Sequence, residues 1–126
     1  MSYRTNNIVI DLSPNADADQ APIKRFVKLI FFMATQESGE RLEFGLERSE
    51  AEETMRIFYV VKGQKYDMAP PPARLFKPIV VMLCNCASVP YYSKGHVKGQ
   101  IETKNPDSTW LLESDDLQKC VVLSKI

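Results

Sequence analysis

Three consecutive prolines, at positions 70 to 72, divide this chain into two parts that share one order of sequence patterns. A proline ring fixes φ and removes the backbone N–H, so this run forces an extended connection. Before it, one segment of helical period precedes three segments of strand period, and the same order returns after it. We therefore expect two helices, each followed by three strands, although the residues themselves show no convincing repeat.

The first part predicts a helix over residues 20–37, with Asp19 as its cap and Gly39 at its end. The turn Lys62-Gly63 is typical of a two-residue hairpin, which sets the register of the strands that it joins. Three strands are expected in this part, at 42–46, 55–61 and 64–68.

The second part predicts a helix over residues 77–88 with Pro78 in its first turn. Gly95 and Gly99 mark a loop after this helix. Strands are expected at 99–103, 109–112 and 119–125. Helices that interrupt antiparallel strands favour an α+β fold, with one sheet and both helices packed on one of its faces. Its expected core comprises Ile30, Leu42, Phe44, Ile57, Tyr59, Ile79, Leu83 and Val122.

Composition limits the number of domains and the class of partner. A chain of 126 residues has the usual size of one domain, here residues 19–126 after a polar tail, 1–18, whose apolar piece at 8–12 suits one short strand. Sixteen basic residues balance sixteen acidic ones, which disfavours nucleic acid as the main partner. No apolar run approaches the roughly 20 residues needed to span a bilayer, and no signal peptide is recognisable. We therefore expect a cytoplasmic chain without a transmembrane segment.

Catalytic and metal-binding motifs are not found in the sequence. A triphosphate site needs a GxxxxGK[ST] loop, which the chain lacks. His96 is the only histidine, which rules out a metal site built on several imidazoles. The three cysteines lack the spacing of a redox pair and are interpreted as buried reduced thiols. The sequence predicts no enzyme, no cofactor and no metal.

The first helix is the best candidate for a binding surface. Its second half is apolar around nearly the whole circumference. A single sheet cannot cover all of this apolar surface. Either the N-terminal tail folds over Phe31 and Phe32, or these two residues anchor a protein partner or a second copy of the chain. Lys24 and Lys28, with Arg25, form a basic rim that suits an acidic partner, although a solvated face is the commoner meaning of such residues.

A weaker candidate is the loop after the second helix. Tyr91 and Tyr92 lie beside Lys94 and His96, an aromatic and basic cluster that could stack on bases. An edge loop with one tyrosine in the core is the commoner explanation for such a cluster.

Several segments together resemble a known family. They are the aliphatic helix after Ala21-Pro-Ile, the strand-Gly63-strand hairpin, the proline-rich crossing and the Gly99-Gln-Ile strand. In this order they are similar to the PAS-like second N-terminal domain of the ATPases that power type II secretion and type IV pilus assembly. The resemblance covers about residues 20–126 and implies a PAS-like domain without its ATPase domain, with a partner in secretion or pilus machinery.

The departures from that family bear on function. Where the family has an Asp, a His and a Glu after the first helix, this chain has Arg41, Glu43 and Gly45. Where it has two hairpin arginines that reach nucleotide, this chain has Phe58 and Val60. We expect a non-catalytic interaction or regulatory module. The alternatives are a PAS-like sensor of a small ligand and a separated piece of a secretion ATPase whose engine is on another chain.

Overall fold

The computed structural model describes residues 8–13 and 21–126. In these residues the predicted order of helices and strands is confirmed, with boundaries that shift by a few residues. The elements are β1 (Ile10–Asp11), α1 (Pro22–Gln36), β2 (Arg41–Arg48), β3 (Glu53–Val61), β4 (Gln64–Met68), the 3₁₀ turn η1 (Ala73–Leu75), α2 (Phe76–Cys86), β5 (Val97–Lys104), β6 (Ser108–Asp116) and β7 (Cys120–Lys125).

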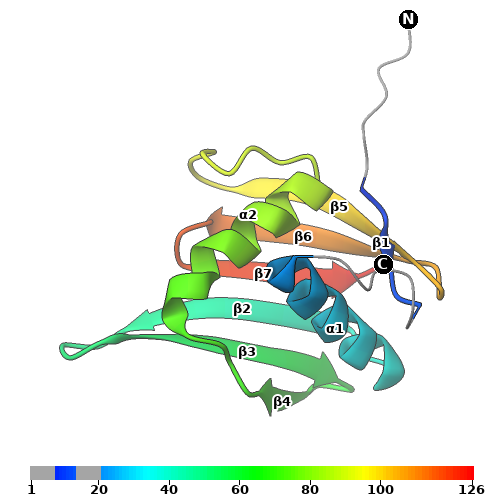
Figure 1. The fold of residues 1–126 in the computed structure, drawn as a ribbon, viewed down its shortest axis with the longest axis horizontal. Helices are drawn as coiled ribbons and strands as arrows, with labels where there is room; N and C mark the ends of the chain where they lie inside the picture. Colours follow the sequence, from blue (N-terminus) through cyan, green and yellow to red (C-terminus); the bar gives the residue numbers. More distant parts are fainter. Residues whose placement is uncertain (1–7, 14–20) are drawn as a thin grey trace, which may run out of the picture.

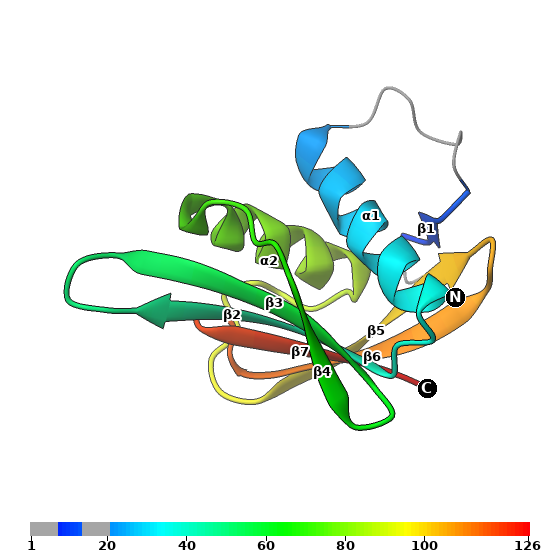
Figure 2. The ribbon, with the colours of Figure 1, turned by 90° about the horizontal axis from the view of Figure 1, so that it is seen from below.

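All seven strands belong to one curled sheet with the order β1-β5-β6-β7-β2-β3-β4. The two halves of the chain meet where β7 pairs with β2, and every pair is antiparallel except β1 with β5. Figure 2 shows α1 and α2 on the same face of the sheet. The predicted α+β class is confirmed.

The two α-helices end in the same way. After α1, Ser38 adopts a φ of 59°, and the Gly39 N–H donates to the carbonyl oxygen of Ala34 at 2.7 Å. After α2, Ser88 has a φ of 57°, and Val89 N–H donates to Cys84 at 2.9 Å. These are Schellman motifs in which a serine, rather than glycine, holds the left-handed position.

The start of α1 also differs from the prediction. Ala21 holds the N-cap position, and its side chain makes no capping hydrogen bond. The predicted cap, Asp19, lies outside the described residues. Among the described residues, no side chain caps the first N–H groups of α1.

The core lies between the helices and the sheet. Phe31 packs edge-on against Trp110, with ring centroids 5.5 Å apart, and both side chains are fully buried. Six of the eight predicted core residues are buried: Ile30, Leu42, Phe44, Ile57, Ile79 and Leu83.

The other two, Tyr59 and Val122, are only partly buried, so that part of the prediction is wrong. Val121 and Leu123 are the core-facing residues of β7, which turns Val122 to the opposite face. Tyr59 stacks on Tyr66 of the outermost strand β4, with centroids 5.4 Å apart.

The expected short strand of the N-terminal tail is β1, at the sheet edge beside β5. Ile10 and Leu12 are buried in the common core. The Asp11 carboxylate accepts hydrogen bonds from the Asn105 side chain at 3.0 Å and from the Ser13 N–H and hydroxyl. These donors lower the pKa of Asp11 to about 2. The rest of the tail, 1–7 and 14–18, lies outside the described residues.

Gly99, predicted to end the loop and begin the strand 99–103, lies within β5, which starts two residues earlier, at Val97. The connection from α2 crosses so closely that a Cβ on Gly99 would lie 2.6 Å from Val89 Cγ2 and 2.7 Å from the Ala87 carbonyl oxygen. Gly95, by contrast, has a φ of 77° and does form a turn.

Candidate interaction surfaces

The structure corrects the predicted aromatic anchors on α1. Phe31 is fully buried against Trp110, so it belongs to the core and cannot contact a partner. Phe32 is partly buried and packs against the same core. The exposed apolar residues of α1 are instead Leu29 and Met33, which are 51% and 39% exposed. The sequence pattern missed this because an almost fully apolar segment does not indicate which of its faces meets the sheet.

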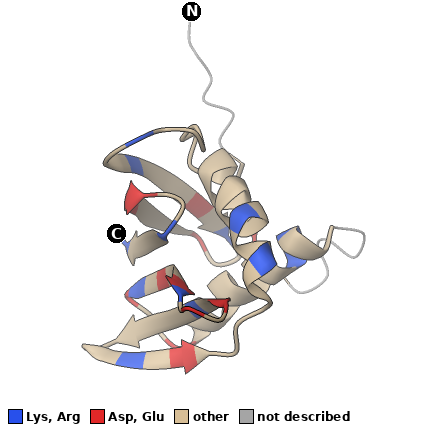
Figure 3. Ribbon diagram, turned by 90° about the vertical axis from the view of Figure 1, so that its left-hand side faces the viewer, with Lys and Arg blue, Asp and Glu red and all other residues tan. Residues whose placement is uncertain are grey.

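The helical layer carries basic residues and no acidic ones. Lys24, Arg25 and Lys28 lie in the first half of α1, and Arg74 and Lys77 lie in η1 and in the first turn of α2. In Figure 3 the helices have blue bands and no red ones, whereas the strands have both. Cations in a first helical turn face the positive end of the helix dipole, where anions are favoured instead. The charge pattern is therefore locally unfavourable for the isolated domain.

Ion pairing differs between the two layers. On the strands, Arg41 pairs with Glu43 at 3.0 Å, Arg48 with Glu53 at 2.9 Å and Arg56 with Asp67 at 3.3 Å. Among the described residues, no carboxylate lies within ion-pair distance of Arg25 or Arg74 on the helical side. The helical layer thus presents guanidinium groups to solvent, whereas the strand arginines bind carboxylates.

An apolar groove runs between α1 and α2. It has a volume of about 240 Å³ and exposes mostly apolar atoms. A smaller depression of about 90 Å³ adjoins it and shares Ile8, Lys24 and Met82 with it. The groove is lined by Ile8, Ile23, Lys24, Pro78, Val81, Met82, Asn85 and Cys86. Burial raises the pKa of the Cys86 thiol to about 11 despite the opposing charge of Lys24, so the cysteine contributes an apolar wall.

The predicted loop cluster is partly brought together. Tyr91, Tyr92 and Lys94 line a hollow of about 430 Å³ together with Asp115 and Asp116, the last two residues of β6. The two tyrosine rings meet edge to face at 5.6 Å, and Tyr92 is 87% exposed. Burial raises the pKa of Tyr91, which agrees with one tyrosine being tucked inward. The two carboxylates oppose a phosphate backbone, so the hollow does not favour bases of nucleic acid.

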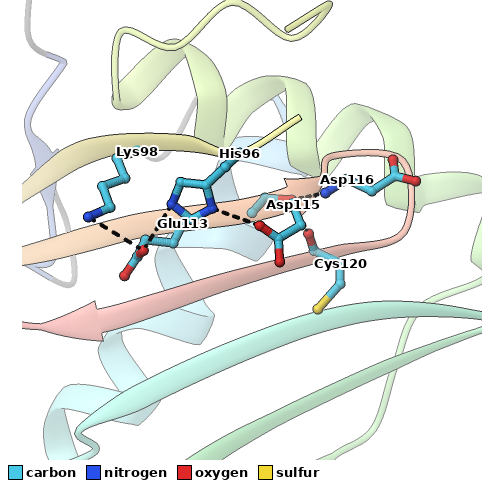
Figure 4. A network of polar contacts seen from close by, with 7 residues as sticks. His96, Lys98, Glu113, Asp115, Asp116 and Cys120 are labelled. Carbon is cyan, nitrogen blue, oxygen red and sulfur yellow. Dashed lines mark hydrogen bonds and ion pairs between the residues drawn. The ribbon is translucent and has the colours of Figure 1, made fainter. Parts of the chain in front are cut away.

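His96 does not line that hollow itself, but it belongs to a network of polar side chains that includes Asp115, which does (Figure 4). Its Nδ1 is 2.7 Å from Asp115 Oδ1, and its Nε2 is 3.3 Å from Glu113 Oε2. Lys98 Nζ is 3.9 Å from the same Glu113 carboxylate. Because both ring nitrogens face carboxylates, neither is open to a substrate proton. The network links β5 to β6 at the surface.

The cysteines follow their prediction in part. Cys84 and Cys86 are buried, and burial raises the pKa of each to about 11, whereas Cys120 is exposed. In the described part of the chain, no group of three or more His, Cys, Asp or Glu residues could hold a metal ion. No helix within residues 8–13 and 21–126 is long and apolar enough to cross a membrane.

Sequence reasoning missed most of the groove and two of the basic residues, Arg74 and Lys77. One signal was available, because no acidic residue occurs between Asp67 and Glu102. The groove itself had no signal in the sequence, because its lining residues come from Ile8, α1 and α2, which are distant from one another along the chain.

Comparisons with known proteins found neither a family model nor a curated protein that matches this chain. The resemblance to secretion ATPases therefore depends on the quoted segments alone and stays a prediction.

Proposed function

We propose that this chain is a non-catalytic interaction module that binds a protein partner through its helical layer. The observation that carries the proposal is a contrast in ion pairing within residues 8–13 and 21–126. No carboxylate of these residues pairs with Arg25 or Arg74, whereas Arg41, Arg48 and Arg56 each pair with one. Local rules of charge placement are most often broken where function requires it. An apolar groove in the same layer is lined in part by Lys24, and apolar grooves with polar rims are typical of binding sites.

The interior gives less support to a small-ligand sensor. Such a sensor needs polar groups that converge on an internal cavity. The two buried polar residues are engaged within the fold: Thr103 bonds to Pro106 and Ser108, and the Ser114 hydroxyl donates to the Cys120 carbonyl. Large side chains such as Trp110 and Phe44 fill the space between helices and sheet.

We further propose that the module acts in the cytoplasm, where its free cysteines stay reduced. The resemblance to secretion ATPases suggests a partner in secretion or pilus machinery. A second copy of the chain is the alternative partner, and sedimentation over a range of concentrations distinguishes the two.

The test is affinity capture from cells of the source organism with charge-reversed variants. Lys24→Glu/Lys77→Glu changes the helical layer, and the matched control Lys119→Glu/Lys125→Glu makes the same charge change at exposed positions of the β6–β7 turn and β7. The expected result is a partner that the parent and the control retain and the helical variant loses. Equal capture by all three, with folding verified by circular dichroism, would refute binding through this layer.

A further inference from the structure

The groove between α1 and α2 has the size for side chains rather than for a whole ligand. Its volume of about 240 Å³ is below the roughly 300–1,000 Å³ of pockets that enclose drug-sized molecules. Its floor and α2 wall are apolar, with Val81 and Met82 partly buried and Cys86 buried. An apolar side chain that entered here would displace water from these atoms, which is favourable in proportion to the area covered.

The α1 end of the same groove is suited to an anion. Lys24 lines the groove, is exposed and pairs with no described carboxylate. Ile23 and Lys24 are also the first residues of α1 with an N–H, since Pro22 has none, and no side chain of the described residues caps them. A carboxylate at this position would meet a lysine, the first N–H groups of α1 and the positive end of the helix dipole together. Arg25 adds a second cation on the next residue.

The apolar part of the groove and its cationic end together indicate the chemistry of the molecule that binds there. From them we propose that the groove binds a short acidic segment of a partner protein, in which a bulky apolar residue is flanked by Asp or Glu. The apolar side chain enters between Met82 and Ile23, and the neighbouring carboxylate binds at Lys24 and the start of α1. This inference rests on the proposed interaction function and specifies the chemistry of its partner.

Other occupants fit the groove less well. A nucleic acid backbone supplies negative charge but no aliphatic side chain, and the chain has no excess of basic residues to attract it. A membrane surface is broad, whereas this groove is narrow and carries its cations on one wall.

The first experiment selects peptides without assuming their chemistry. The full chain is immobilised and used to select random 15-residue peptides displayed on phage. The expected enriched peptides combine one bulky apolar residue with neighbouring acidic residues. Enrichment of neutral or basic peptides, or no enrichment over a blank surface, would overturn the inference.

The second experiment locates the binding of the best peptide, measured by fluorescence anisotropy. Lys24→Glu and Met82→Lys should each weaken binding by about tenfold or more, and Val81→Lys should repeat the effect if Met82→Lys does not fold. Lys119→Glu and Leu29→Lys are the matched controls for charge and for an apolar-to-lysine change away from the groove, and they should bind as the parent does. Equal binding by Lys24→Glu would overturn the inference.

Three further arms separate other occupants from the proposed one. Phosphatidylserine vesicles that bind the chain and lose binding in Met82→Lys would assign the groove to a membrane. Tighter peptide binding by Asp17→Asn/Asp19→Asn would assign it to the chain's own acidic segment. A third outcome separates this inference from the proposed function. If Lys24→Glu/Lys77→Glu loses a cellular partner but the selected peptides lack acidic residues, this inference is overturned and the interaction function stands.

Discussion

The identity of some residues in this protein is required by close tertiary contacts that the local sequence does not reveal. Gly99 is the clearest case, because it lies in a strand, where glycine is usually unfavourable. Because Gly99 has no side chain, the Ala87 carbonyl and the Val89 side chain can lie against its backbone. Both residues belong to the connection from α2 to β5. Gly45 also lies in a strand, but a Cβ there would meet no atom within 4 Å. The two glycines therefore have different roles.

We expect Gly99→Ala to lower the free energy of unfolding by about 1–3 kcal/mol, because backbone or packed side chains must move to admit the methyl group. Gly45→Ala is the matched control and should be neutral or slightly stabilising, since alanine suits a strand better than glycine. Urea denaturation of both variants measures the difference. Equal midpoints for the two would contradict the close crossing.

Ser38, in contrast to Gly99, carries a side chain at a backbone position that favours glycine. With a φ of 59° it pays the cost of the left-handed conformation after α1. Ser38→Gly should raise the free energy of unfolding by up to about 1 kcal/mol. Ser38→Ala keeps the Cβ and controls for loss of the hydroxyl, so thermal unfolding should show a gain for glycine alone.

At the scale of elements, α1 has one face in the core although nearly all its residues are apolar in the second half. Phe31 is fully buried against Trp110, and its neighbour Phe32 is only partly buried. Phe31→Ala should therefore cost about 3–5 kcal/mol of stability, and Phe32→Ala less than half as much. Chemical denaturation compares the two, and a larger loss for Phe32→Ala would mean that the helix is rotated from the face described.

The Asp11 carboxylate adds side-chain hydrogen bonds to the backbone pairing and the buried side chains that hold β1 at the sheet edge. Hydrogen bonds from Asn105 and Ser13 favour its charged form and lower the pKa of Asp11 from 3.8 to about 2. The folded protein thus binds this proton less readily than the unfolded chain does. The resulting stability is fully present above pH 3.8 and is lost as the pH falls through about 2.

Asp11→Asn should consequently be less stable than the parent at neutral pH and lose less stability on acidification. Asp107→Asn, at an exposed position between β5 and β6, makes the same charge change and should follow the parent. Unfolding midpoints at neutral and acidic pH measure the effect, and amide exchange of Leu12, which donates to Lys104 at 2.9 Å, reports on β1 directly. Identical pH profiles for Asp11→Asn and the parent would show that the carboxylate does not hold the strand.

At the scale of the whole molecule, the charges balance in number but not in position. Within residues 8–13 and 21–126 the helices carry basic residues and no acidic ones, while the acidic residues belong to strands, loops and turns. Such a distribution gives the domain two faces of different potential without a net charge, which favours orientation of a partner over long-range attraction of polyanions.

We expect the isolated protein neither to hydrolyse ATP nor to bind it tightly. The sequence has no phosphate loop, and Phe58 and Val60 stand where the resembled family has arginines. Both side chains are nearly buried on β3, and Phe58 is covered by Arg56 and Lys65. A magnesium-dependent ATPase assay and calorimetric titration measure this. Turnover above background that a point mutation in this chain abolishes would contradict the prediction.

The sequence by itself determined the α+β class, the order of helices and strands and the hairpin at Lys62-Gly63. Periodicity and turn chemistry are local properties, so they can be read along the chain. Most of the core followed as well, although Val122 was assigned to the wrong face. In a strand, an error of one residue reverses the side on which every side chain lies.

The exposed face of α1, the need for glycine at position 99 and the pairing of cations with carboxylates in the described residues follow from the packing of distant segments. Trp110 covers Phe31, Ala87 crosses Gly99, and Ile8 meets both helices at the groove. A lysine next to an apolar residue can belong to a solvated face or to a binding site. At Lys24 the difference is the groove beside it, which exists only once α1, α2 and the segment around Ile8 have packed together.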